Sequence, residues 1–332
     1  MVVVITGGAG HIGTNLATAL LADGHRVRIV DLNEPRTAIR HGAEWVRADI
    51  RDPAAMLRAC DGAGVVYHLA AVISVVGGLG GLVQSVNVDG VRTVAQSALA
   101  AGAPRLVHCS SVHAFDLTSG ELIDEGAPRS TASGVPAYDR SKAAGEVELR
   151  RVVERGLDAV VVNPTGVIGP VDEAPSRMGT VLAALWRRRM PAVVAGGFDW
   201  VDVGDVVLAL RAAAERGRTG ESYLVPGHRR SLTELADLAR ACSGIAVTRR
   251  TAPLWSARLC APIATAIARR THNPLLPTRE ALAAVAAFPF VDGSKAAREL
   301  GHRPRPIEET VAALFTYFQR HGYFGPSRRP EP

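Results

Sequence analysis

Lysine is almost absent from this chain. Only Lys142 and Lys295 are lysines among its 38 basic residues, and the rest are arginines. Cysteine is scarce too, and its few copies stand far apart, without the spacing of a metal site or a disulfide framework. They are Cys60, Cys109, Cys242 and Cys260. The sequence therefore predicts no metal centre, and it favours a reducing, cytoplasmic setting.

Long apolar runs are missing as well. No window approaches the roughly 18 unbroken apolar residues of a membrane span. The apolar start, Met1 to Ile5, is too short for a secretory signal and lacks its charged region. With 47% hydrophobic and 21% charged residues, the composition is that of a soluble globular protein. A length of 332 residues suits one large α/β unit with a smaller second lobe.

Positive charge is unevenly spread. Residues 1–160 hold 15 Arg or Lys against 17 Asp or Glu, a net charge of −2, whereas residues 161–332 hold 23 against 15, a net charge of +8. A basic second half favours an anionic substrate or a membrane surface, although a general preference for arginine explains it equally well. No basic run is interleaved with aromatic residues, so nucleic acid is not expected as a partner.

One of the two lysines follows one of only five tyrosines by four residues. Four residues are about one helical turn, so the phenol of Tyr138 and the ammonium of Lys142 are expected on the same helix face. A nearby ammonium favours the phenolate and is expected to lower the pKa of the tyrosine from about 10. A tyrosine with such a partner can act as a general acid or base. The ordinary alternative is a chance pair on a helix.

Short β-branched runs alternate with helical segments through the first half of the chain. Strands are expected at 2–5, 26–30, 45–46, 64–69, 105–109 and 158–162, and long helices at about 81–100 and 138–155. This alternation predicts a parallel sheet with helices on both faces, a Rossmann-like doubly wound α/β fold. Beyond residue 170 the pattern loosens into helices at about 180–189, 232–242 and 307–321, with short strands near 193, 200 and 223.

A glycine-rich turn follows the first expected strand and opens a helix, which is the context of a dinucleotide-binding fingerprint. Glycines let the backbone approach a pyrophosphate, whose charge sits at the helix N-terminus. The turn residues expected to hold the cofactor are Gly7, Gly10, His11, Ile12 and Gly13. Asp31, at the end of the second strand, would bind the adenosine ribose and repel a 2′-phosphate. The sequence therefore favours NAD over NADP, with Arg36 the one nearby residue that would reverse the preference.

The domain boundary is expected near residue 170. Residues 1–170 would form the NAD-binding domain with the catalytic residues. Residues 171–332 would form mainly a smaller C-terminal substrate lobe, with 201–216 packing back on the sheet.

A mostly apolar segment, 253–270, lies in the second part. It begins near Trp255, and its charges are Arg258, Arg269 and Arg270. The segment suits a lid over an apolar pocket better than a helix on a membrane surface, and both alternatives stay open.

Together these features resemble the extended short-chain dehydrogenases/reductases, the NAD-dependent epimerase/dehydratase family, over most of the chain. Besides the glycine turn and Asp31, the resemblance rests on a set of short motifs. They are Asp49-Ile50, His68-Leu69-Ala70-Ala71, Asn87-Val88-Asp89-Gly90, Ser110-Ser111, Tyr138-x-x-x-Lys142, Asn163 to Pro170 and Val201 to Val206. The resemblance implies an NAD-dependent enzyme, and a homodimer formed through the two long helices that precede and contain the catalytic residues.

The resemblance also implies contacts for individual residues. Asp49 and Ile50 would contact the adenine, Leu69, Ala70 and Ala71 would line the path of the cofactor, Asn87 would brace the catalytic helix, Lys142 would hold the nicotinamide ribose, and Pro164 and Val167 would lie near the nicotinamide.

The implied catalytic set is Ser111, Tyr138 and Lys142. Ser111 would hydrogen-bond a substrate oxygen, and Tyr138 would give or take the proton while hydride moves between the substrate carbon and the nicotinamide. His113 replaces a small hydroxyl residue often found at its place. It is a candidate for substrate contact, with a packing or surface role equally open. Asn163 is a further candidate.

Phe198 departs from the nucleotide-sugar branch of the family, which usually has an arginine here to clamp a diphosphate. The chain instead looks closer to the dihydroflavonol-reductase-like branch. The expected function is interconversion of a carbonyl and a secondary alcohol on a small, moderately apolar substrate, with Phe198 as a candidate contact. The alternative is a nucleotide-sugar epimerase or dehydratase that keeps its NAD tightly bound. A non-catalytic dinucleotide sensor is a third, less favoured class.

Overall fold

The computed structural model describes residues 1–36, 39–271 and 273–324. Their contacts divide the chain into two compact units. The first unit joins residues 1–165, 203–226 and 289–303, and the second joins 166–202, 227–288 and the chain from 304 on. The chain therefore enters the second unit close to the expected boundary, but it returns twice to the first.

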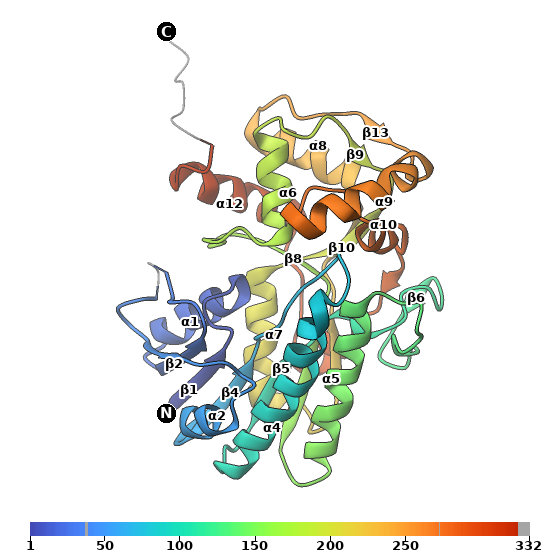
Figure 1. Cartoon of the computed structure of the whole chain (residues 1–332). Helices are drawn as coiled ribbons and strands as arrows, with labels where there is room; N and C mark the ends of the chain where they lie inside the picture. Colours follow the sequence, from blue (N-terminus) through green and yellow to red (C-terminus); the bar gives the residue numbers. More distant parts are fainter. Residues whose placement is uncertain (37–38, 272, 325–332) are drawn as a thin grey trace. The chain divides into compact units, whose positions relative to one another are not determined.

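A seven-stranded sheet forms the centre of the first unit (Figure 1). All neighbouring strands are parallel, in the order β11-β7-β5-β4-β1-β2-β3. The strands are β1 (Val2–Thr6), β2 (Arg26–Asp31), β3 (Glu44–Arg47), β4 (Ala63–His68), β5 (Leu106–Cys109), β7 (Ala159–Pro164) and β11 (Ser222–Val225). Their β-branched runs suit a sheet that helices cover. The predicted Rossmann-like fold is confirmed.

Two groups of helices pack around this sheet. In one group α2 (Pro53–Cys60) contacts α4 (Val91–Ala100), and α4 lies beside α5 (Ala137–Val153), as Figure 1 shows. In the other, α7 (Val203–Arg216) contacts both α1 (His11–Ala22) and α11 (Ser294–Leu300). A small parallel pair, β6 (Leu122–Ile123) with β14 (Phe290–Val291), ties the late segment to this unit.

The helix expected at 81–100 is not regular, and this corrects the prediction. A short turn η1 (Leu79–Gly81) precedes α3 (Leu82–Gln84), because Gly81 has a left-handed φ of 94° that a helix cannot continue. A π-helical turn η2 (Ser85–Gly90) then leads into α4. Such turns are rare and are often found at functional sites, and this one carries Asn87.

The second unit has its own small sheet, β12 (His228–Ser231), β10 (Gly197–Asp202) and β8 (Gly166–Ile168), and a strand pair, β9 (Val193–Val194) with β13 (Thr251–Ala252). Its helices are α6 (Arg177–Trp186), α8 (Leu232–Ser243), α9 (Leu254–Thr271), α10 (Arg279–Ala286) and α12 (Ile307–Arg320). A core of this unit contains Trp200, Leu182, Leu235 and Phe318, each fully buried. The strands β8 and β12 and the helix α10 were not predicted, because none carries a distinctive hydrophobic period.

No helix within the described parts of the chain combines the length and the apolar character needed to cross a bilayer.

Candidate active site

The order of strands in the large sheet reverses between β1 and β4, and ligands of such sheets bind at the carboxyl ends of the strands beside this point. Gly7 follows β1, and Leu69 follows β4, where its backbone N–H donates to the Thr6 carbonyl at 3.0 Å. Gly7 has a φ of 71°, and a Cβ there would lie 2.6 Å from the backbone nitrogen of Ala70. The glycine turn and the residues after β4 are therefore in direct contact.

The turn also lies tightly against the start of α1. A Cβ on Gly13 would lie 2.4 Å from the Gly7 carbonyl oxygen, so no larger residue fits without moving backbone. Gly10 is the N-cap of α1, and no side chain caps this end, whereas α2, α6 and α8 are capped by Asp52, Ser176 and Ser231. The N-terminus of α1, formed by the backbone of Gly10, His11 and Ile12, has no side-chain cap and fits a pyrophosphate.

Asp31 lies next to this turn at the end of β2. One carboxylate oxygen accepts a hydrogen bond from the Ala9 N–H at 3.1 Å, and the other accepts one from the Asn33 N–H at 2.9 Å. The structure thus brings together the acid and the glycines that the sequence pointed to, and both fit a bound dinucleotide.

Two predicted adenine contacts have partners within the protein. Asp49 pairs with Arg51 at 2.6 Å, and hydrogen bonding to this guanidinium lowers the pKa of the carboxyl. The Ile50 side chain is buried and packs against Gly90. Contact of these two residues with an adenine stays a prediction.

Asn87 bridges the segment after Ala71 to the helix that carries the tyrosine. Its side-chain oxygen accepts from the Val72 N–H at 2.8 Å, and its amide donates to the Val72 carbonyl and to the Ser141 hydroxyl, both at 2.9 Å. The Ser141 hydroxyl in turn donates to the Tyr138 carbonyl at 2.7 Å. The π-turn therefore places Asn87 where it fixes the first turns of α5.

Ser111, Tyr138 and Lys142 are all buried, Ser111 just after β5 and the other two on α5. Burial raises the pKa of the Tyr138 phenol, and a hydrogen bond with the Ser111 side chain lowers it in part. The prediction that Lys142 lowers the pKa of Tyr138 overall is therefore wrong, because burial, which disfavours the charged phenolate, is the largest effect on this pKa. Asp139 adds to the rise in pKa.

Lys142 lies in a confined space. Its ammonium donates to the Cys109 carbonyl at 3.2 Å, and burial lowers its pKa. Burial also raises the pKa of the Cys109 thiol to about 11, so the thiol is protonated at neutral pH. A compact ammonium fits here, whereas the planar fork of an arginine needs more room and more acceptors.

His113 is adjacent to the tyrosine. Its ring lies edge-on to the Tyr138 ring, with centroids 5.7 Å apart, and its Nδ1 is 3.2 Å from an Asp139 carboxylate oxygen. Its backbone N–H donates to the Ser111 hydroxyl at 3.2 Å. The structure therefore places His113 beside the Ser111 hydroxyl and the Tyr138 ring, and its contact with substrate stays a prediction.

Sequence reasoning missed Glu146 and Arg129. Glu146 is buried one turn beyond Lys142; it accepts from the Asn163 amide at 2.7 Å and pairs with Arg129 at 2.9 Å. The same Asn163 amide donates to the Ser111 carbonyl at 3.0 Å. Asn163 is fully buried, so what the structure shows for it is a positioning contact. The spacing of Tyr138, Lys142 and Glu146 by four residues was the available signal.

Two stacked histidines, His68 on β4 and His108 on β5, lie on neighbouring strands of the large sheet. The rings of His68 and His108 are 5.1 Å apart and nearly parallel, and His68 is hydrogen-bonded to the Thr6 hydroxyl at 2.6 Å. Burial is the main cause that lowers the pKa of His68 to about 3 and that of His108 well below its usual value, and Lys142 lowers both further. Both imidazoles are therefore neutral in the folded protein.

These histidines predict a loss of stability in mild acid. Their pKa is depressed by folding, so their contribution is fully present above the unfolded pKa of about 6.5 and is lost as pH falls towards the folded value. Between pH 6 and pH 5 each should lower the free energy of unfolding by about 1 kcal/mol. His108→Leu, a substitution of similar volume, should halve this loss in urea unfolding curves. His41→Gln, at an exposed position, should leave this loss as it is in the wild type. If the free energy of unfolding depended on pH equally in the wild type and both variants, the assignment would be contradicted.

The remaining predicted residues lie at the end of β7 or in the second unit. Pro164 ends β7. Val167 is on β8, opposite Val201 of β10, and Phe198 is on β10 with its ring edge-on to Trp200 at 5.2 Å. Phe198 packs against the core of its unit.

Comparisons with known proteins agree with this geometry. The model of the NAD dependent epimerase/dehydratase family matches residues 3–225. The sterol demethylase protein B of Methylococcus capsulatus is 31% identical over 97% of this chain and 99% of its own length. A putative dihydroflavonol 4-reductase of Synechocystis is 30% identical over 96% of this chain and 95% of its own. Among solved structures, a nucleoside-diphosphate-sugar epimerase from Pseudomonas aeruginosa is 25% identical, with a TM-score of 0.78, and the match covers 98% of this chain and 99% of that one.

The family model spans the glycine turn, Asp31 and the Ser111, Tyr138 and Lys142 set, and the two curated relatives cover nearly the whole chain. The chain belongs to the NAD-dependent epimerase/dehydratase family, the extended short-chain dehydrogenases/reductases, and is an enzyme of that NAD(P)-dependent oxidoreductase and epimerase type.

Proposed function

We propose that this enzyme is an NAD-dependent oxidoreductase that interconverts a carbonyl and a secondary alcohol on a small, moderately apolar substrate. The observation that carries the proposal is that Ser111, Tyr138 and Lys142 are buried together, with the Ser111 side chain close enough to the phenol to lower its pKa and Lys142 one turn along the same helix. A substrate oxygen placed between the two hydroxyls would accept a hydrogen bond from Ser111 and a proton from Tyr138.

The residues around the glycine turn would hold the cofactor, which when bound supplies a nicotinamide ring that accepts or donates hydride. The Gly7 to Gly13 backbone would bind the pyrophosphate, and Asp31 would accept hydrogen bonds from the adenosine ribose. Lys142 would donate to the nicotinamide ribose, and its charge would favour the phenolate of Tyr138. The carboxylate of Asp31 repels a 2′-phosphate, which supports NAD over NADP.

The apolar substrate class is supported by the second unit. Phe198 and Trp200 lie on β10, where the nucleotide-sugar branch is expected to carry its arginine. A relative named for dihydroflavonol reduction and one named for sterol demethylation agree with such a substrate. The homodimer and the cytoplasmic setting stay predictions.

A nucleotide-sugar epimerase that retains its NAD is the second candidate, and one observation favours it. Arg230 on β12 stands opposite Phe198 in the antiparallel register, so the two side chains share a face of the small sheet. A guanidinium is thus available one strand away from the missing arginine.

Net cofactor turnover separates the two functions. The purified enzyme is first assayed for NAD that survives dialysis, and then mixed with NAD and a panel of apolar secondary alcohols, UDP-sugars and dTDP-sugars. The proposal expects dissociable NAD and a growing absorbance of reduced nicotinamide with an alcohol. Retained NAD and a converted sugar nucleotide without any change in that absorbance would establish the epimerase instead.

Asp31→Ser should weaken NAD binding by about 10- to 100-fold, because a charge-assisted hydrogen bond contributes roughly 1.5–3 kcal/mol. It should also narrow the preference for NAD over NADP, since the repelling charge is gone. Titration of each dinucleotide by protein fluorescence measures both effects. Asp23→Ser, an exposed aspartate that follows α1, is the matched control. An unchanged ratio of the two affinities would contradict the role of Asp31.

A further inference from the structure

The helix α9 exposes its largest apolar side chains to solvent. Trp255, Leu259, Ile263 and Ile267 follow one another at intervals of four residues, and they are 66%, 71%, 68% and 46% exposed. At 3.6 residues per turn this spacing makes one continuous stripe along the helix. We call these four residues the outer stripe.

The opposite face of α9 is buried and carries small residues. Ala261, Ala264 and Ala268 are between 1% and 7% exposed, and α9 contacts α10. A surface helix normally directs its large apolar residues into the core and its polar residues to water. In α9 this order is reversed, so the outer stripe is not explained by the packing of its own unit.

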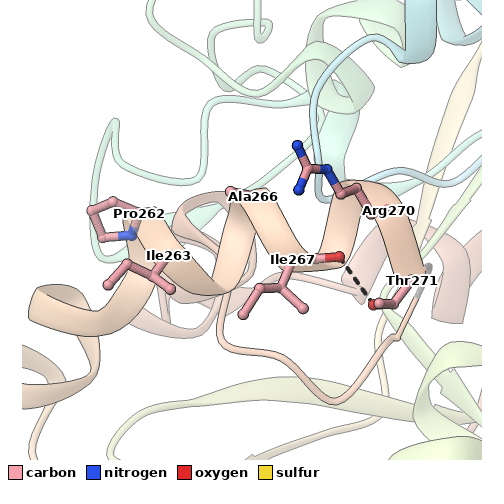
Figure 2. Close-up of a pocket in the computed structure, with 6 residues that line it drawn as sticks. All are labelled: Pro262, Ile263, Ala266, Ile267, Arg270 and Thr271. Carbon is pink, nitrogen blue, oxygen red and sulfur yellow. Dashed lines mark hydrogen bonds between the residues drawn. The ribbon is translucent and has the colours of Figure 1, made fainter.

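Further apolar groups widen the stripe near its end. Pro262 and Ala266 line a hollow in the surface of α9 together with Ile263, Ile267 and Arg270. Figure 2 shows Ile263 and Ile267 projecting from the same side of the helix. The Thr271 hydroxyl donates to the Ile267 carbonyl at 3.0 Å, which helps to hold the last turn in helical form.

The charged residues within α9 and in the chain that leads into it have one sign. Between Asp237 and Glu280 the sequence contains no acidic residue. From residue 249 to 279 it contains Arg249, Arg250, Arg258, Arg269, Arg270 and Arg279. Arg258 and Arg269 fall on one edge of the stripe by helical spacing, and Arg270 falls within it.

The apolar outer stripe and its neighbouring arginines together indicate the chemistry of the partner that binds this face of α9. An apolar stripe about 18 Å long, bordered by arginines, complements a flat surface that has an apolar interior beneath a negatively charged outer layer. A bilayer with anionic headgroups has these properties. Tryptophan prefers the interface of a bilayer, and Trp255 stands at the start of the stripe.

We propose that α9 is an interfacial helix that binds this enzyme to membranes containing anionic phospholipid. The outer stripe enters the boundary between headgroups and acyl chains, and the arginines contact lipid phosphates. This inference does not depend on the reaction that the enzyme catalyses.

Sedimentation with vesicles tests the proposal. The full chain should sediment with vesicles of phosphatidylglycerol and phosphatidylcholine in equal parts, and at least tenfold less with phosphatidylcholine alone. Ile263→Glu should lower the partition coefficient at least tenfold, and Arg258→Gln about fivefold. Leu208→Glu is the matched control, because Leu208 is 58% exposed on α7, and it should bind as the wild type does. Far-UV circular dichroism and NAD affinity would show that each variant is folded.

A second measurement reports the position of α9 itself. Cys260 is exposed on this helix, whereas Cys60 and Cys109 are buried, so an environment-sensitive fluorophore on Cys260 in a Cys242→Ser background labels α9. Its emission should shift to the blue with the anionic vesicles only. Failure to sediment, or equal sedimentation of wild type and Ile263→Glu, overturns the proposal. If Ile263→Glu instead loses turnover of a water-soluble substrate and no vesicle binding is seen, α9 is a lid over the substrate.

Discussion

Tyr138→Phe is expected to lower turnover by about 10²- to 10⁴-fold, the usual contribution of a positioned proton donor. Affinity for NAD should stay within about twofold of wild type, because only one oxygen is removed. The loss should appear in kcat and in kcat/KM alike, since the proton is transferred only in the reaction step.

The control for this substitution is another buried tyrosine. Tyr67 lies on β4 of the large parallel sheet and is 3% exposed. Tyr67→Phe therefore removes a buried hydroxyl outside the predicted catalytic set. It should leave turnover near the wild-type rate. If Tyr138→Phe retained activity within a few-fold of wild type, the proton would come from elsewhere, and His113 beside the ring would be the next residue to substitute.

The raised pKa of Tyr138 gives this prediction a pH dependence. Because burial keeps the phenol protonated at neutral pH, it is ready to act as an acid. Reduction of a carbonyl should therefore be nearly independent of pH between about 6 and 8, whereas oxidation of the alcohol needs the phenolate and should become faster as pH rises. The rise of alcohol oxidation with pH should disappear in Tyr138→Phe, because the titrating phenol is gone.

Local patterns predicted the strands and the helix around the glycine turn well. A β-branched run, a glycine turn and an acid after the next strand are close in sequence, and each has one physical explanation. The contacts of Gly7 with Ala70 and of Asp31 with Ala9 agree with that explanation. The parallel sheet could be predicted as well, because a chain that alternates strands and helices has few other ways to pack them.

Contacts between distant segments could not be predicted in this way. The π-turn at Asn87 has no signal in the sequence beyond the glycine at its end, Gly90, and the regular helix expected there was wrong in detail. The pKa of Tyr138 depends on how deeply the fold buries it, and a spacing of four residues carries no information on depth. The pairing of Glu146 with Arg129 joins residues 17 apart through a buried space that the fold alone creates.

That buried pair leads to the second large expected effect. Glu146→Leu should lower the free energy of unfolding by about 3 kcal/mol, because it leaves Arg129 without its nearest carboxylate and removes one of the two acceptors of the Asn163 amide. Arg129 keeps its place over the Phe115 ring at 3.8 Å, which limits the loss to the lower part of the usual range of about 3–5 kcal/mol. Urea unfolding measures the change. Glu154→Leu, on the exposed end of the same helix, should change it by less than about 0.5 kcal/mol.

The partner substitution distinguishes an unpaired charge from a simple loss of packing. Arg129→Met in the Glu146→Leu background should restore much of the lost stability, because the buried cation is then gone. Turnover should not recover with it. The Asn163 amide also holds the Ser111 carbonyl at 3.0 Å, and without Glu146 that amide is free to turn, so Ser111 loses its fixed position beside Tyr138. A double variant that regains both stability and kcat would show that Glu146 supports the fold but does not position the catalytic serine.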